Sequence, residues 1–278
     1  MQVIRKSIIC FAILMAVHWL LVLLCPGAGM PTHQWQDNLV KAQAFLYAEH
    51  CDTAMVGTSL SGRILRDSIP SVRSVSFGGC AVEDGLRIVS HREQLPRYVL
   101  VETNLFLNEG NDEMVSNLSE GVVPWIKSVV PSLREQYEPI CLLASVLMKS
   151  GNINAQAGAA VVDTVLLNDR IAQHLRDDKG LDPQKAEQRL HTLQGMMAPL
   201  EARGVKFVFF EMPVNPRLQH LKSYGQTRDI VRRAFPPGRY QYLPADTAQY
   251  LTTDGEHLDY EGQQRFSAFI KRQLEKMD

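Results

Sequence analysis

Only one of the eight histidines in the sequence has an acidic residue three positions before it. This is His257, which follows Asp254 in a segment, Asp254–Gly262, that holds two glycines and four acidic residues. Such a composition predicts a turn-rich loop. In this loop the Asp254 carboxylate can accept a hydrogen bond from one imidazole nitrogen, so that the other nitrogen can act as a general base. The alternative is that the two side chains only order the turn.

A hydroxyl, a backbone N–H and a side-chain amide could complete a site around this base. Ser59, Gly78 and Asn104 each stand just after a short apolar run of the sequence. A serine hydroxyl becomes a nucleophile once a base takes its proton, while N–H groups and amides stabilise the oxyanion that then develops. With Asp254 and His257, these residues supply the groups that serine-dependent acyl transfer requires.

The apolar runs predict the strands that would bring these residues together. The predicted strands cover Thr53–Gly57, Val72–Phe77, Val99–Glu102 and Val205–Glu211, with a weaker fifth run at Tyr240–Leu243. Helical patterns alternate with them, most clearly at Pro183–Arg203 and Glu261–Lys276. This alternation predicts an α/β fold, a three-layer α/β/α sandwich with a mostly parallel, flavodoxin-like sheet. In such sheets ligands bind beyond the carboxyl ends of the strands, where the candidate residues stand.

Composition and strand spacing divide the chain into segments. Residues 1–29 are apolar and are predicted to be an N-terminal signal anchor, and residues 30–50 a linker and lead-in helix. Residues 51–278 are predicted to form one α/β domain. About a hundred residues separate its third and fourth predicted strands, far more than a crossover connection needs. We therefore expect a helical insertion at about 108–181.

In order and content, these segments resemble the sequence blocks of the SGNH (GDSL-type) hydrolases. Gly57-Thr58-Ser59 is similar to the block that carries the nucleophile of that family, and Asp254 and His257 match its terminal Asp-x-x-His. The resemblance spans most of the chain after the apolar N-terminus. It implies a Ser-His-Asp catalytic triad that works without a cofactor or a metal ion.

The same resemblance implies an oxyanion hole. Its donors would be the backbone N–H groups of Ser59 and Gly78 and the side-chain amide of Asn104, with Gly79 as the alternative alignment to Gly78. Three positions depart from the family pattern: Thr58 replaces the usual Asp, Glu102 the usual Gly, and Leu105 the second Asp. None of these departures removes a catalytic group.

With its apolar N-terminus and its Glu-x-Asn block, the chain is similar to membrane-anchored SGNH proteins that modify polysaccharides. These include relatives of the alginate-acetylation and teichoic-acid D-alanylation proteins. The resemblance implies acetyl transfer to or from a hydroxyl of an extracytoplasmic polysaccharide, through an acyl-enzyme on Ser59. It also implies a multispanning membrane-bound O-acyltransferase as the source of the acyl group. The alternatives are a plain carbohydrate or small-ester esterase (a deacetylase) and a non-catalytic accessory subunit of such a membrane complex.

The N-terminus predicts attachment to a membrane. Ile8–Leu24 is a run of seventeen residues without a charge, preceded by Arg5 and Lys6. At 1.5 Å per residue it covers about 26 Å as a helix, close to the thickness of a bilayer core. The two basic residues are expected to stay inside the cell. We therefore expect a single-pass anchor in the cytoplasmic (inner) membrane, with the rest of the chain in the periplasm or outside; the alternative is a cleaved signal peptide.

The sequence argues against several other classes of protein. The formal net charge is −1, without the basic excess of nucleic-acid-binding proteins. The histidines are not spaced as zinc ligands, and Gly57–Ser61 falls one residue short of the nucleophile elbow of α/β-hydrolases. We expect Cys51, Cys80 and Cys141 to be buried free thiols. We expect Trp125, in the insertion, to lie in the core, the alternative being a glycan groove or a partner interface.

Overall fold

The computed structural model describes residues 1–65, 69–119, 121–151, 163–246 and 248–277. Their contacts divide the chain into two units, and each unit is described by itself. The first unit consists of Met1–Val40 and Glu120–Ile153, and the second of Lys41–Ser119 and Asn154–Asp278.

The second unit is built on a sheet of five parallel strands. The strands are β1 (Thr53–Gly57), β2 (Val72–Ser76), β3 (Tyr98–Glu102), β4 (Lys206–Phe210) and β5 (Gln241–Tyr242). Their order is β2-β1-β3-β4-β5, which is the flavodoxin-like order of doubly wound folds. The predicted α/β fold is therefore confirmed, and every predicted strand ends within one residue of an observed one.

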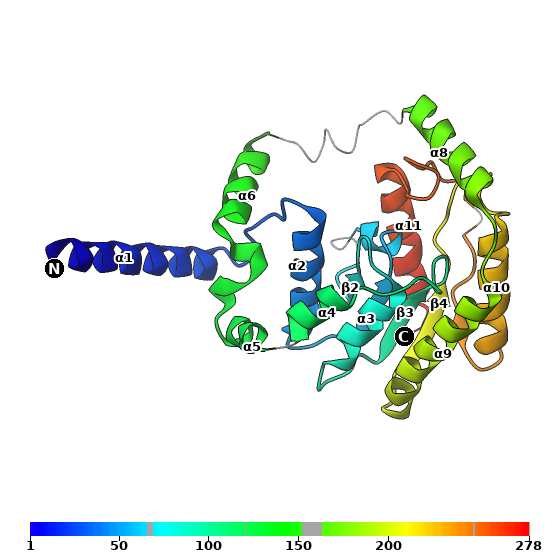
Figure 1. The fold of residues 1–278 in the computed structure, drawn as a ribbon, viewed down its shortest axis with the longest axis horizontal. Coiled ribbons are helices and arrows are strands. Elements are labelled where there is room, and N and C mark those ends of the chain that lie inside the picture. The colour runs from blue at the N-terminus through cyan, green and yellow to red at the C-terminus, as the bar shows by residue number, and fades with distance from the viewer. Residues whose placement is uncertain (66–68, 120, 152–162, 247, 278) are drawn as a thin grey trace. The chain divides into compact units, whose positions relative to one another are not determined.

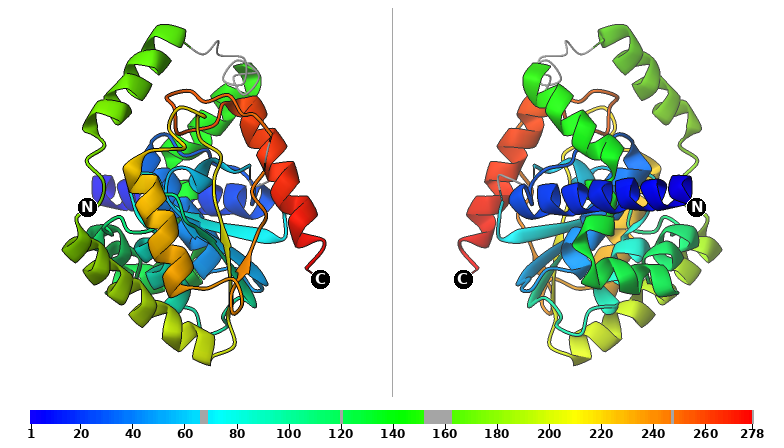
Figure 2. Two further views of the ribbon diagram at one scale, coloured as in Figure 1. Left: turned by 90° about the vertical axis from the view of Figure 1, so that its right-hand side faces the viewer. Right: turned by 90° about the vertical axis from the view of Figure 1, so that its left-hand side faces the viewer.

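Helices cover both faces of this sheet. Among the described residues, the α-helices that lie wholly in the second unit are α3 (Val82–Ser90), α4 (Asp112–Ser119), α8 (Thr164–Asp177), α9 (Pro183–Ala202), α10 (Lys222–Ala234) and α11 (Tyr260–Leu274). Figure 1 shows the order of these elements, and in Figure 2 α11 and α9 lie on opposite sides of the sheet. The predicted helices at Pro183–Arg203 and Glu261–Lys276 correspond to α9 and α11. Asp182 and Asp259 cap their N-termini by accepting backbone hydrogen bonds.

The two faces of the sheet bury different side chains because successive residues of a strand point in opposite directions. On one face, Met55 and Leu100 belong to a hydrophobic cluster with Phe266 of α11. On the other, α3 approaches so closely that a Cβ on Gly85 would lie 2.9 Å from the Cβ of Val56. This packing holds α11, and with it the loop just before α11, at the sheet.

The first unit is helical. It contains α1 (Gln2–Leu24), the first part of α2 (Gln34–Leu46), α5 (Val122–Val129) and α6 (Pro139–Gly151), with short 3₁₀ turns η3 (Pro131–Leu133) and η4 (Glu135–Tyr137). The helix α1 is long and apolar enough to cross a membrane. The predicted insertion at 108–181 contains α4 and α8 of the second unit as well as α5 and α6 of the first; residues 152–162 lie outside the described residues.

Two of the predictions on single side chains need correction. Cys80 and Cys141 are buried free thiols as expected, but Cys51 is only half-buried. The prediction that Trp125 is a core residue is wrong, since 64% of its surface is exposed. The reason is local: α5 has no buried residue at all, so it shows its apolar side chains to the outside.

Candidate active site

Ser59 lies at the tip of a tight turn that directly follows β1. The turn is closed by a hydrogen bond from the Gly62 N–H to the Thr58 carbonyl, 2.9 Å long, and by one from the Leu60 N–H to Thr58 Oγ1. Thr58 is buried, while Ser59 is half-buried and keeps part of its surface open to solvent. The turn thus presents the Ser59 hydroxyl at the carboxyl end of a central strand, where ligands of parallel sheets bind.

His257 and Asp254 lie in a closed loop before α11. An isolated bridge between Thr252 and Leu258 closes the loop, and the Thr253 N–H donates to the His257 carbonyl over 2.8 Å. The Asp254 carboxylate accepts from the backbone N–H of His257 over 2.8 Å, which fixes its direction. The sequence prediction of a turn-rich loop at this place agrees with the structure.

A second contact holds this loop from outside. Glu256, between the two candidate residues, accepts a hydrogen bond of 2.5 Å from the hydroxyl of Tyr224 on α10. Burial raises the pKa of Tyr224, and the neighbouring Glu256 carboxylate raises it further, so the hydroxyl stays a donor. Gly255 has a φ of +101° and no space for a side chain, since a Cβ would lie 2.9 Å from both Ile171 and Leu218.

The three side chains form one hydrogen-bonded chain. His257 Nε2 lies 2.9 Å from Ser59 Oγ, and His257 Nδ1 lies 2.7 Å from Asp254 Oδ2. Because an ionised carboxylate can only accept, the Nδ1 proton belongs to this second bond, which leaves Nε2 to accept the serine proton. Burial alone would raise the pKa of Asp254, but hydrogen bonds from the His257 side chain and backbone outweigh it and lower that pKa. The sequence-predicted Ser59, His257 and Asp254 are thus brought together.

The other two predicted residues stand on either side of Ser59. β2 and β3 are the two neighbours of β1, so Gly78 and Asn104 follow the strands that flank it. The Phe77 N–H donates to the Gly57 carbonyl over 3.4 Å, which ties the start of the glycine loop to the end of β1. Gly79 has a φ of +72°, so this position of the loop favours glycine.

Asn104 also has a structural partner that the sequence did not indicate. Its Nδ2 donates to the Met212 carbonyl over 2.9 Å, and its Oδ1 accepts from the Met212 N–H over 2.7 Å. The pair joins the end of β3 to the segment after β4. The Asn104 amide carries two hydrogens, and this contact uses one of them.

Glu102 is a functional candidate that the sequence reasoning missed. Its side chain is fully buried at the end of β3. It accepts hydrogen bonds from the backbone N–H of Thr58 (2.9 Å) and Ser61 (3.0 Å) and from the hydroxyls of the same two residues (2.8 and 2.6 Å). Thr58 and Glu102, which looked like two separate departures from a family pattern, therefore form one contact under Ser59. The signal in the sequence that could have indicated this role is the acidic residue at the end of an otherwise apolar strand.

This carboxylate leaves no room at Gly57. A Cβ there would lie 2.1 Å from Ser61 Oγ and 2.6 Å from Glu102 Oε2. The end of β1 must therefore be glycine for the carboxylate to reach the turn.

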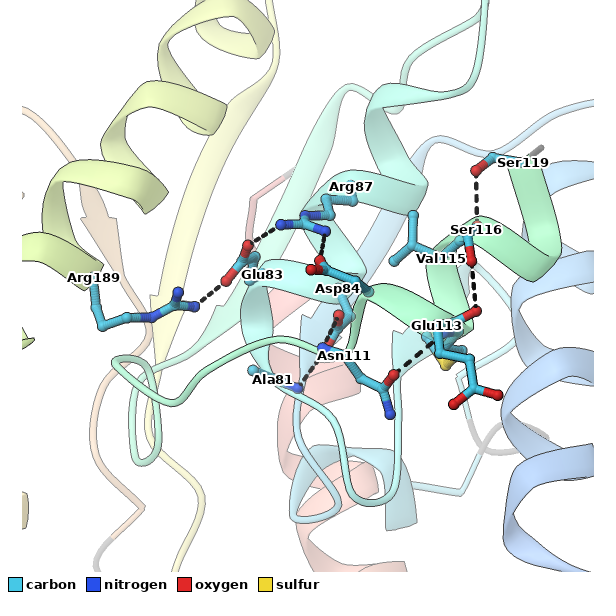
Figure 3. A network of polar contacts seen from close by, with 12 residues as sticks. Ala81, Glu83, Asp84, Arg87, Asn111, Glu113, Val115, Ser116, Ser119 and Arg189 are labelled. Atoms are coloured by element: carbon cyan, nitrogen blue, oxygen red, sulfur yellow. Dashed lines mark hydrogen bonds and ion pairs between the residues drawn. The ribbon is translucent and has the colours of Figure 1, made fainter.

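A second buried polar network holds the helix that follows the glycine loop (Figure 3). Asp84, at the start of α3, accepts from the N–H of Ala81 over 2.8 Å and from that of Asn111 over 2.7 Å. The adjacent Glu83 forms ion pairs with Arg87 on the same helix and with Arg189 on α9. Burial raises the pKa of Asp84 above its usual value. The network ties the start of α3 to the segment just before α4 and to α9.

A groove of about 560 Å³ opens beside the segment that follows β4. Its lining includes Met212, the partner of Asn104, together with an ion pair between Arg228 and Glu211 at 2.6 Å. His220 and Tyr250 also line it. The groove therefore combines hydrogen-bonding groups with one aromatic side chain at the carboxyl end of β4.

No metal site is evident in the part of the chain that the structure describes, where no three His, Cys, Asp or Glu side chains cluster suitably. Neither models of known protein families nor the sequences of curated proteins show a match to this chain.

Proposed function

We propose that the protein transfers an acyl group, most simply acetyl, to a hydroxyl of an extracytoplasmic polysaccharide through an acyl-enzyme on Ser59. The observation that carries this proposal is the hydrogen-bonded chain from Ser59 through His257 to Asp254. In this proposal the chain is an SGNH-type enzyme anchored in the cytoplasmic membrane by α1. Its α/β domain works in the periplasm, and a multispanning membrane-bound O-acyltransferase supplies the acyl group.

The first half of the reaction forms the acyl-enzyme. Ser59 Oγ attacks the carbonyl carbon of the acyl donor while His257 Nε2 takes the hydroxyl proton. The Asp254 carboxylate stabilises the imidazolium that results. When the tetrahedral intermediate collapses, His257 returns this proton to the leaving group, and the acyl group stays on Ser59.

The second half transfers the group. A sugar hydroxyl attacks the acyl carbon, His257 takes its proton, and the proton passes to Ser59 Oγ as the ester product leaves. In both halves the N–H groups of Ser59 and Gly78 and the second amide hydrogen of Asn104 stabilise the oxyanion. Each such donor is worth roughly 10²–10³ in rate.

The polar lining of the groove after β4 is compatible with a carbohydrate as the acceptor. Its charged and amide side chains can bind sugar hydroxyls.

The test is acetyl turnover by the full-length protein in detergent. 4-Nitrophenyl acetate serves as the donor, with and without an oligosaccharide acceptor. Ser59→Ala and His257→Ala should each lower turnover by roughly 10³-fold or more. Ser90→Ala and His91→Ala change the same residue types on the exposed end of α3 and serve as matched controls. Mass spectrometry of the quenched reaction should find one acetyl group on Ser59.

The outcomes separate the alternatives. Acetyl on the oligosaccharide supports transfer, and mutant-sensitive release of acetate alone in the presence of acceptor identifies an esterase. Turnover that survives Ser59→Ala contradicts the assignment of the nucleophile. A folded protein that neither cleaves 4-nitrophenyl acetate nor becomes acetylated would be the accessory subunit.

A further inference from the structure

The first unit shows an unusual amount of apolar surface after α1. Eight large apolar side chains on α5 and α6 are more than half exposed. They are Val122, Val123, Trp125, Val129, Ile140, Leu143, Val146 and Leu147, at 52–66% exposure. We call these eight residues the α5–α6 patch. Soluble proteins seldom leave such a set uncovered.

Three charged side chains of the same segment have partners within it. Lys127 pairs with Glu135 at 2.5 Å, and both are largely buried. The Arg134 guanidinium donates to the carbonyls of Lys127 and Ser128. These three charges have partners inside the segment, while Glu138 is exposed and accepts a hydrogen bond from Gln36 of α2.

The helix α6 has the polarity of a helix that faces lipid. Ile140, Leu143 and Leu147 are spaced three and four residues apart and lie on one exposed face. Cys141 and Ser145, which are also four apart, are buried on another face. A helix of a soluble protein places its apolar stripe inward. Here the apolar stripe points outward.

Contacts with α1 place this segment at a definite depth. His18 Nε2 lies 3.0 Å from the Ser132 carbonyl in η3, and Val22 is the buried residue of α1. The Tyr137 hydroxyl donates to the Pro26 carbonyl just after α1, over 2.8 Å. In Figure 1 the C-terminal end of α1 meets the chain between α5 and α6.

The depth agrees with that of known interfacial helices. His18 stands six residues before the end of α1 at Leu24, or about 9 Å along the helix axis. Helices that lie in a membrane surface bury their apolar faces by about 5–10 Å. A segment bound to α1 at His18 therefore lies at the level of the outer headgroups and upper acyl chains once α1 crosses the bilayer.

We propose that the α5–α6 patch is a second membrane contact, which lies in the outer leaflet and packs against lipid acyl chains. This inference rests on the part of the proposed function that places α1 across a membrane. Lipid rather than a protein partner is indicated because the patch belongs to the same unit as α1, whose last turns contact the chain between α5 and α6. A tryptophan among aliphatic side chains is also the composition of a membrane interface.

Fluorescence quenching of single tryptophans in the full-length protein tests whether the α5–α6 patch contacts lipid. The chain has three, Trp19 in α1, Trp35 in α2 and Trp125 in α5, and replacing two at a time by Phe leaves one reporter. Each variant is reconstituted into pure phosphatidylcholine vesicles. Lipids with bromine on the upper acyl chain report contact with the membrane, and aqueous iodide reports contact with water. Circular dichroism confirms that each variant keeps its helices.

The emission of Trp125 should fall with the brominated lipids and should be protected from iodide. Trp19, in the membrane helix, should respond in the same way. Trp35 serves as the comparison outside the patch. Quenching of Trp125 by iodide but not by brominated lipid, with Trp19 still quenched by lipid, would overturn the proposal. Such a result would leave a protein partner as the occupant of the patch. If Trp19 also fails to respond to lipid, the membrane position of α1, and not the patch alone, is wrong.

Discussion

Glu102 concentrates four hydrogen bonds on one buried carboxylate beneath the candidate nucleophile. A buried charge is costly unless hydrogen bonds replace its water, and here two backbone N–H groups and two hydroxyls do so. All four donors belong to the turn on which Ser59 stands. The carboxylate therefore acts through the backbone, by holding the position of Ser59.

Replacing Glu102 by Ala should destabilise the protein and reduce activity. The substitution leaves the buried N–H groups of Thr58 and Ser61 without their acceptor, which costs about 1–3 kcal/mol for each group. Glu102→Gln keeps one acceptor oxygen and the shape of the side chain, so its loss should be smaller. Urea unfolding measures the stability, and acetyl turnover measures the position of Ser59. Equal stability of wild type and Glu102→Ala would contradict this role.

Asp254 predicts a pH dependence of stability. Its pKa in the folded protein is lowered below the ordinary value of 3.8, so folding favours the charged carboxylate. The resulting stability is fully present above about pH 4 and is lost as the pH falls toward the folded pKa. Asp254→Asn should therefore be less stable than wild type at pH 7, and the difference should shrink below pH 4. Thermal unfolding of both proteins across this pH range measures the difference in stability. A difference that grows in acid would contradict the prediction.

The site residues could be predicted where they directly follow a predicted strand, at the carboxyl edge of the sheet, or where they share one loop. Ser59 and Asn104 follow apolar runs, and His257 has Asp254 within one loop, so spacing was sufficient. The contacts of Glu102 with Thr58 and of Asn104 with Met212 could not be found in this way. They depend on how individual side chains meet across neighbouring strands, which spacing along the chain does not give.

At the scale of elements, the strands were predictable because each is a short apolar run with glycine, proline or polar residues at its ends. Even β5, only two residues long, lies inside its predicted run. Trp125 was misjudged for a physical reason. An apolar helix was expected to pack inward, and this rule fails for a helix that faces a medium other than water.

The close approach of β1, β3 and the turn predicts that Gly57→Ala is strongly destabilising. The new methyl group would overlap Ser61 Oγ and Glu102, and overpacking of this kind costs about 1–3 kcal/mol or more. Gly195→Ala is the matched control: this glycine lies inside α9 with open space around it, so alanine should stabilise the helix by about 0.5–1 kcal/mol. Urea unfolding of both variants should show opposite signs, and a neutral Gly57→Ala would show that the turn can relax.

At the scale of the whole molecule, attachment through both α1 and the α5–α6 patch predicts that membrane binding is lost in two steps, one for each contact. Ile13→Arg with Leu14→Arg places two charges at the centre of α1, which costs roughly 5–7 kcal/mol of insertion free energy. This double variant should still sediment with vesicles at neutral pH, held by the patch, but should be extracted at pH 11, unlike wild type. Adding Trp125→Glu and Leu143→Glu should release it at neutral pH as well. Full release by the two arginines alone would mean that α1 is the sole attachment.

The contact between Thr58 and Glu102 also restricts how such sequences can diverge. In the SGNH pattern that the chain resembles, these two positions hold Asp and Gly. A change of Thr58 to Asp alone would set two carboxylates against each other in the interior, and a change of Glu102 to Gly alone would leave the turn without an acceptor. Either order of single steps therefore passes through a less stable protein. Related sequences should therefore carry either Thr with Glu or Asp with Gly at these two positions. A change from one pair to the other should need a third substitution that first stabilises the protein.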